Sequence, residues 1–202
     1  MLRSPHRPPV RDHVFAPEGE GGLPAVVRLH RVGKRLRDRT ALGTDRLSVM
    51  IDAMAVRIEP ADVTDLHQVL EDHARYWGVR DLRALHVTAL VQEFGSTCLV
   101  ARAVDGIRGY LFGFVTPDHT GYVHLVATRD DARGVGLGRS LYAAFIEAAG
   151  RQGAVRLKAI TSVTNEGSIA FHRTLGFDAR TVEDYDGPGR PRVVFTRELL
   201  PR

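Results

Sequence analysis

The chain has 202 residues, of which 44% are hydrophobic and 26% are charged, a composition typical of a soluble globular protein. Its single cysteine, Cys98, excludes an intrachain disulfide, and no apolar run reaches the length of a membrane span. The N-terminal residues also lack the apolar core of a secretory signal. We therefore expect a cytoplasmic protein without a membrane partner.

Positive charge is concentrated in the first quarter of the chain. The formal net charge is +4, and residues 1–50 hold ten Lys and Arg against five Asp and Glu, so the rest of the chain is close to neutral. Five prolines and a Gly-rich segment interrupt this stretch. We interpret residues 1–53 as a disordered basic extension, unless translation starts at Met50 or Met54. A basic arm can bind nucleic acid, but this one lacks interleaved aromatic residues, so nucleic acid is not the expected partner.

From residue 54 the chain is expected to form one α/β domain that extends to residue 202. The first predicted elements are a strand at 56–60, helices at 64–77 and 82–94, and strands at 96–104, 107–116 and 122–128. Asp62 or Thr64 can cap the first helix. The second helix is expected to bury a face that consists of Leu85, Ala89, Leu90 and Phe94. Asp105-Gly106 is a strong signal for a two-residue hairpin turn.

The second half of the domain begins with a glycine-rich turn that follows the strand at 122–128. A helix to about residue 150, a strand at 155–160, a helix at 165–174 and strands at 177–185 and 192–198 are predicted after it. The whole order is β-α-α-β-β-β-α-β-α-β-β. A domain of this kind builds a sheet with helices packed on it.

The glycine-rich turn places Gly134, Gly136 and Gly138 at the start of a helix. Glycine allows a ligand to approach the backbone closely, and a helix N-terminus attracts an anion such as phosphate. Arg133 and Arg139 flank the turn and can add charged hydrogen bonds. A phosphorylated cofactor is therefore expected. The spacing differs from Gly-x-Gly-x-x-Gly of dinucleotide-binding folds, and the lysine of a Walker loop is missing.

The turn resembles the acetyl-CoA pyrophosphate loop of the GNAT N-acetyltransferase superfamily, Arg/Gln-x-x-Gly-x-Gly/Ala, which matches Arg133 to Gly138. A second matching block follows at the distance found in the superfamily, with Asn165, Phe171-His172 and Gly176-Phe177. The order of elements is also that of the GNAT fold, a mixed central sheet flanked by helices. The resemblance covers residues 55–199. It implies an acetyl-CoA-dependent enzyme that acetylates a primary amine by direct attack in a ternary complex.

The same resemblance implies the residues that hold acetyl-CoA. Backbone groups near Val126 and Thr128 would bind the pantetheine arm, and one N–H would stabilise the oxyanion. The pyrophosphate would lie against Arg133, Gly134, Gly136, Gly138 and Arg139. Asn165 would hydrogen-bond the cofactor, or else only cap a helix. The acceptor is expected to be a small-molecule or peptide amine, and a homodimer is the habit of the superfamily.

Two histidines are the candidate catalytic residues. His124 shares one strand face with Tyr122, and histidine suits a general base because its ordinary pKa lies near neutrality; the alternative is a histidine that only hydrogen-bonds within the sheet. His172 stands where the superfamily has a tyrosine acid, and its imidazolium could donate to the leaving sulfur. Alternatively His172 packs beside the cofactor, and Tyr142, Tyr185 or water supplies the proton.

Other function classes remain open at this point. A catalytically silent acyl-CoA-binding sensor would keep the turn at 133–138 and tolerate the missing tyrosine, and a nucleic-acid-associated protein would use the basic arm. No metal site is expected, since His119 and His124 have no third ligand nearby.

Overall fold

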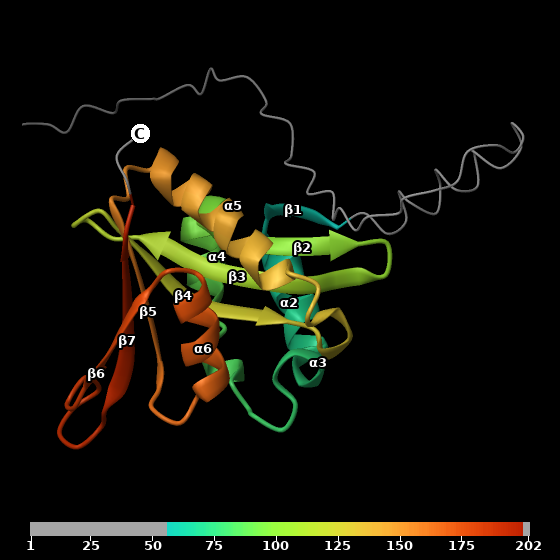
Figure 1. The fold of residues 1–202 in the computed structure, drawn as a ribbon. Helices are drawn as coiled ribbons and strands as arrows, with labels where there is room; N and C mark the ends of the chain where they lie inside the picture. Colours follow the sequence, from blue (N-terminus) through green and yellow to red (C-terminus); the bar gives the residue numbers. More distant parts are fainter. Residues whose placement is uncertain (1–55, 200–202) are drawn as a thin grey trace, which may run out of the picture.

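The computed structural model describes residues 56–199, and the predicted extension at 1–53 lies outside them. These residues form a seven-stranded sheet with the order β1-β2-β3-β4-β5-β7-β6 (Figure 1). Neighbouring strands are antiparallel except β4 and β5, which are parallel. The predicted mixed sheet is therefore confirmed.

The bounds of the elements are as follows. The strands are β1 (Arg57–Pro60), β2 (Leu99–Ala103), β3 (Gly106–Val115), β4 (Thr120–Thr128), β5 (Arg156–Ser162), β6 (Asp178–Val182) and β7 (Arg192–Glu198). The α-helices are α2 (Val63–Glu71), α3 (His73–Trp77), α4 (Thr88–Phe94), α5 (Leu137–Arg151) and α6 (Glu166–Thr174). Short 3-10 turns are η1 (Arg83–Leu85), η2 (Gly95–Thr97) and η3 (Asp130–Ala132). Among the described residues, no helix is both long and apolar enough to cross a membrane.

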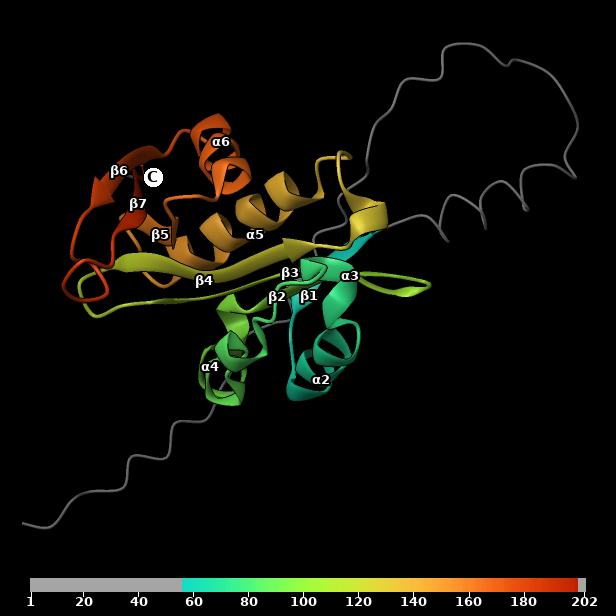
Figure 2. The ribbon, with the colours of Figure 1, turned by 90° about the horizontal axis from the view of Figure 1, so that it is seen from below.

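The helices form a layer on each face of the sheet. Figure 2 shows α5 and α6 on one face and α2, α3 and α4 on the other. Each layer has its own apolar core, with Phe145 of α5 fully buried in one and Tyr110 of β3 in the other. Gly113 of β3 lets α5 approach the sheet, because a Cβ there would lie 2.6 Å from the Phe145 ring.

The first predicted helix has the expected start but is split in two. Asp62 accepts a hydrogen bond from the Asp65 N–H at 2.9 Å, and the Asp65 side chain accepts one from the Asp62 N–H at 3.2 Å. This capping box fixes the start of α2. The expected single helix at 64–77 is interrupted at Asp72, where α2 gives way to α3.

The predicted helix at 82–94 is present only in its second half. Residues 83–85 form only the turn η1, and α4 begins at Thr88. The expected buried face is exposed, since Leu85 is 42% and Phe94 is 38% accessible, and α4 instead buries Val91. The predicted hairpin is confirmed, but its two loop residues are Val104 and Asp105, one position earlier than expected.

Candidate active site

The turn before α5 contains two glycines with left-handed backbone angles. Gly134 has φ +77° and Gly136, the N-cap of α5, has φ +87°. A Cβ at either position would meet nothing within 4 Å, so the backbone angle rather than a lack of space requires glycine. Gly138 differs, because a Cβ there would lie 3.1 Å from the ring of Phe171. This glycine lets α5 and α6 pack closely.

The N-terminus of α5 is suited to an anion. The first N–H groups of a helix lack intrahelical acceptors and carry the positive end of the helix dipole, and no side chain caps this end of α5. Arg133 and Arg139 lie exposed on either side of the turn, and Arg133 Nη2 donates to the Tyr76 carbonyl at 3.0 Å. Phosphate groups bind at helix ends of this kind.

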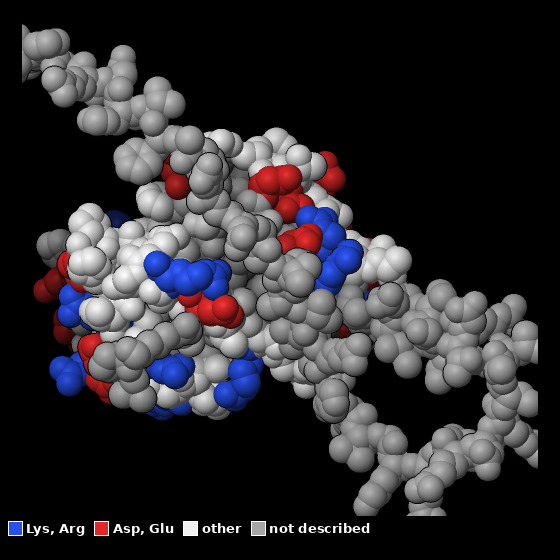
Figure 3. Space-filling view, turned by 90° about the horizontal axis from the view of Figure 1, so that it is seen from above, with Lys and Arg blue, Asp and Glu red and all other residues white. Residues whose placement is uncertain are grey.

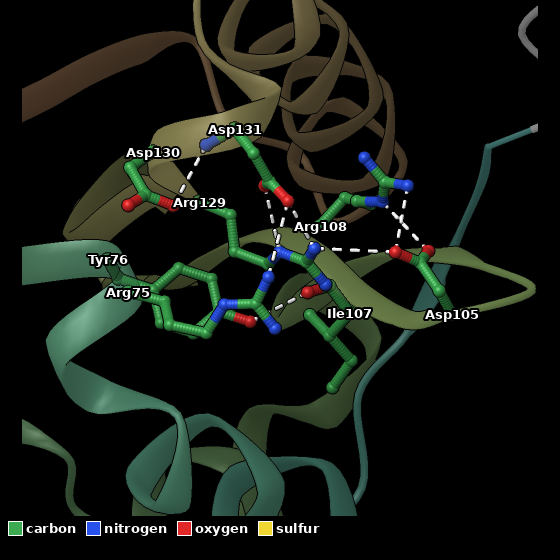
Figure 4. A network of polar contacts seen from close by, with 8 residues as sticks. All are labelled: Arg75, Tyr76, Asp105, Ile107, Arg108, Arg129, Asp130 and Asp131. Atoms are coloured by element: carbon green, nitrogen blue, oxygen red, sulfur yellow. Dashed lines mark hydrogen bonds and ion pairs between the residues drawn. The ribbon is translucent and has the colours of Figure 1, made fainter.

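A buried arginine fixes the backbone just before this turn through ion pairs (Figure 4). The Arg129 side chain is 3% exposed and binds Asp131 through Nε at 3.0 Å and Nη2 at 2.5 Å. Its Nη2 also lies 3.3 Å from Asp105, in the β2–β3 hairpin. Arg75 of α3 donates to the same Asp131 at 3.2 Å. Two elements distant in sequence thus fix the direction in which the chain enters the turn.

A cleft opens where β4 leaves β5. The two strands pair only from Thr120↔Arg156 to Val123↔Ala159, while β5 continues alongside β7. The strand before the turn therefore diverges from β5 after Val123. The resulting cleft measures about 1030 Å³. It gathers the residues that the sequence predicted for cofactor binding together with the two candidate histidines: His124, Val126, Thr128, Arg133, Gly134, Gly136, Gly138, Arg139, Asn165 and His172.

Asn165 caps α6 and also lies at the wall of the cleft. Its Oδ1 accepts from the Ser168 N–H at 3.2 Å and so caps α6, while its Nδ2 donates to Thr161 Oγ1 at 2.9 Å. The same residue lines the cleft. The cap is thus present, and the contact with a cofactor stays a prediction.

His124 lies at an irregularity of β4. In the pairing of β3 with β4, Phe112 faces Leu125 and Gly113 faces Val123, so the register passes over His124; bulges of this kind redirect side chains. His124 Nε2 lies 2.9 Å from the Leu85 carbonyl. A carbonyl oxygen only accepts, so Nε2 carries a proton, and in the neutral ring Nδ1 has the lone pair. That nitrogen can accept a proton in the cleft.

His172 has surroundings that do not suit the expected imidazolium acid. It is 3% exposed and stacks on Phe195 with ring centroids 4.0 Å apart. Its Nδ1 donates to the Ser168 carbonyl at 2.8 Å, so its Nε2 accepts from the Tyr142 hydroxyl at 2.6 Å. Burial lowers the pKa of His172 and raises that of Tyr142. The ring is therefore neutral and has no free N–H for a leaving thiolate.

The sequence model of the acetyltransferase (GNAT) family matches residues 66–177, more than half of the chain. The chain belongs to this family. The match begins in α2 and ends just after α6, so it includes the glycine turn, the splayed strand β4 and both candidate histidines.

Two curated relatives of this GNAT chain are L-methionine sulfoximine/L-methionine sulfone acetyltransferases from Pseudomonas paraeruginosa and Pseudomonas aeruginosa. Each is 42% identical over 77 residues, which are 38% of this chain and 38% of the relative. Ard1 from Thermoplasma volcanium has a similar structure, with a TM-score of 0.62 and 18% identity over 71% of this chain and 97% of its own. YncA from Salmonella typhimurium, solved with its cofactor acetyl-CoA, has a TM-score of 0.56 and 22% identity over 73% of this chain and 95% of its own. These two likenesses show the GNAT fold.

Several residues of the GNAT site were not predicted. Arg80, Leu82 and Leu85, which line the cleft beside Trp77, were not singled out. Leu85 contributes a carbonyl group, so no side-chain pattern could have revealed it. Within residues 56–199, no group of His, Cys, Asp and Glu is arranged to hold a metal ion.

Proposed function

We propose that the protein transfers an acetyl group from acetyl-CoA to a primary amine. The observation that carries this proposal is the joining of two features in one cleft: the uncapped N-terminus of α5 beside Arg133 and Arg139, and the edge of β4 that no longer pairs with β5 after Val123. The first suits a pyrophosphate. The second offers backbone groups to an amide-bearing arm such as pantetheine.

In this proposal two parts of acetyl-CoA bind different parts of the chain. The pyrophosphate lies at residues 133–139, and the pantetheine arm follows β4 past Val126 and Thr128. Asn165 has a second amide hydrogen for the arm beyond its bond to Thr161. Bound acetyl-CoA supplies an activated thioester carbonyl, and the residues of the chain orient it and handle protons.

His124 is proposed as the general base. Its Nδ1 lone pair takes a proton from the acceptor ammonium, and the neutral nitrogen then attacks the thioester carbonyl carbon. A C–N bond forms, the C–S bond breaks, and coenzyme A leaves as a thiolate. His172 has no free N–H, so the second proton that the attacking nitrogen loses as the amide forms passes through water in the cleft to this thiolate. The neutral His172 is assigned to holding α6 against α5 through Tyr142.

A small amino-acid-like amine is the acceptor to test first. The Pseudomonas relatives are acetyltransferases of L-methionine sulfoximine and L-methionine sulfone. Asp186 and Arg192, which form an ion pair at 2.5 Å, also line the cleft and offer partners for an ammonium and a carboxylate. Peptide amines, polyamines and protein lysines form the rest of the panel. A cytoplasmic location and a homodimer stay predictions that fractionation and sedimentation can test.

The experiment is to measure thiol release from acetyl-CoA by the purified full-length protein with each amine. Release that depends on an amine, and that an Arg133→Glu, Gly136→Asp double variant loses, would support the transferase. The His124→Gln variant should bind acetyl-CoA normally and lose about 10²-fold in kcat, the lower end of the general-base range. Unchanged kcat would remove His124 from the mechanism.

A second candidate function is an acyl-CoA-binding sensor. It is favoured because both ring nitrogens of His172 are already hydrogen-bonded within the protein, which leaves no acid at this position. Tight binding of acetyl-CoA in calorimetry without thiol release for any amine would support the sensor. The nucleic-acid alternative has less support. Figure 3 shows positive and negative side chains interspersed on the face of the domain that it displays, and the basic arm lies outside the described residues.

A further inference from the structure

The connection between α3 and α4, residues 78–87, forms one wall of the cleft and touches the proposed base. It contains only the short turn η1, and its residue Val79 is fully exposed. Nevertheless the Leu85 carbonyl accepts the Nε2 proton of His124 at 2.9 Å. The protonation pattern of His124 therefore depends on a segment that has little regular structure of its own.

Two buried histidines fix this connection through hydrogen bonds to the backbone of Leu82. The Leu82 N–H donates to His73 Nε2 at 3.2 Å. The Leu82 carbonyl accepts from His86 Nδ1 at 2.9 Å. His73 and His86 are 2% and 7% exposed, and their rings meet edge to face with centroids 5.7 Å apart. Both polar groups of one peptide residue are thus fixed from inside the protein.

The bond from His86 to Leu82 belongs to a chain of bonds with a single direction. The Trp77 indole N–H can only donate, and it reaches the Tyr110 hydroxyl at 2.7 Å. The Tyr110 hydroxyl then donates to His86 Nε2, also at 2.7 Å. His86 is left with its proton on Nδ1, directed at the Leu82 carbonyl. Burial, which lowers the pKa of His86, favours the same neutral form.

We propose that His86 is a positioning residue for His124. By holding Leu82, it keeps the Leu85 carbonyl three residues later in place, so that His124 carries its proton on Nε2 and presents the Nδ1 lone pair to the acceptor. This role rests on the proposed function for its effect on rate, but the state of the His124 ring is defined without any substrate.

The first test is a double-mutant cycle on thiol release. We expect His86→Phe, which keeps the ring and loses both hydrogen bonds, to lower kcat about tenfold, less than the loss expected for His124→Gln. If His86 acts through His124, the double variant should be no slower than His124→Gln alone. Full activity of His86→Phe, or losses that multiply in the double variant, would overturn the proposal. Full activity of His124→Gln would overturn it together with the base assignment.

The second test reads the ring of His124 directly. In full-length protein with ¹⁵N-labelled histidine rings, the His124 signals are those missing from His124→Gln. The wild type should show a protonated Nε2 and a bare Nδ1, and His86→Phe should show a mixture of tautomers. An unchanged His124 tautomer would refute the positioning role even if no amine is ever acetylated, so the two proposals can fail separately.

Two further variants separate positioning from general loss of structure. His86→Asn can replace the Nδ1–H donor to Leu82, and it should restore most of the rate and the His124 tautomer. An Asn variant as impaired as the Phe variant would contradict the role of the Leu82 bond. Thr97→Val is the matched control, because it removes side-chain bonds of a buried residue to the Phe94 and Gly113 carbonyls, which lie outside the connection at 78–87. It should leave the His124 tautomer unchanged.

Discussion

Gly136 and Gly150 lie near opposite ends of α5, and alanine at the two positions should change stability in opposite directions. Gly136 has φ +87°, where a Cβ costs about 1–2 kcal/mol. Gly150 is an exposed residue in the last turn of α5, and a Cβ there meets nothing within 4 Å. Alanine at Gly150 restricts the unfolded chain without straining the helix, so it should stabilise by roughly 0.4–1 kcal/mol.

These magnitudes are large enough to measure by thermal and urea unfolding. For a chain of this size about 1 kcal/mol corresponds to roughly 2–4 °C in Tm. Gly136→Ala should therefore lower Tm by about 2–8 °C and Gly150→Ala should raise it by about 1–4 °C. Calorimetry should also show weaker acetyl-CoA binding only for Gly136→Ala, because its backbone angle directs the N–H groups of the turn.

Two results would refute this reasoning. If Gly136→Ala is as stable as the wild type, the left-handed angle at the N-cap is not a constraint on the turn. If both variants bind acetyl-CoA normally while Gly136→Ala is destabilised, the turn is strained by alanine but does not bind the pyrophosphate. The assignment of residues 133–139 would then fail, although the account of the fold would stand.

Three other predictions address the network, the cap and the pH dependence. Arg129→Met should lower the free energy of unfolding by about 1.5–3 kcal/mol, the range for a hydrogen bond to a charged group. The loss stays within this range because the carboxylates of Asp105 and Asp131 are exposed and become hydrated without Arg129. Urea unfolding that matches the wild type would contradict the network. Asn165→Ala should lose about 1 kcal/mol with the helix cap, whereas Asn165→Asp keeps the acceptor, so weaker acetyl-CoA binding by Asn165→Asp at wild-type stability would assign the amide to the cofactor. Burial lowers the pKa of both His86 and His172, so below about pH 6.5 the unfolded chain binds protons that the folded chain excludes. The free energy of unfolding should fall between pH 7.5 and 5.5, and a flat profile would show that these rings are protonated in the folded state.

Local signals in the sequence were sufficient for most elements. The capping box at Asp62 and the hairpin signal near Asp105 each depend on neighbours a few residues away, which the sequence displays directly. The glycine turn was predictable because a left-handed N-cap and a following apolar helix are both local. The order of elements and the mixed sheet therefore followed from the sequence together with the family resemblance.

The features that sequence reading missed depend on contacts between distant residues. The spacing of Leu85, Leu90 and Phe94 suggested one helix, but the backbone of Leu82 is held by buried histidines on either side of it in sequence, and the segment before α4 contains only the turn η1. Likewise His172 looked free to donate a proton. Its partner Tyr142 is 30 residues earlier, and no local pattern shows that its ring is already occupied.

If acetyl-CoA binds where β4 separates from β5, as proposed, the stability of the folded protein depends on the supply of this acyl donor. A molecule that binds between these strands needs both in their native positions, so it binds the folded chain alone and shifts the folding equilibrium by mass action. At a ligand concentration of 100 times Kd this amounts to about 2.7 kcal/mol, comparable to the loss of a buried ion pair. A cell short of the donor would then hold a less stable enzyme that is more open to proteolysis. Metabolic supply would in this way set the amount of catalyst as well as its rate.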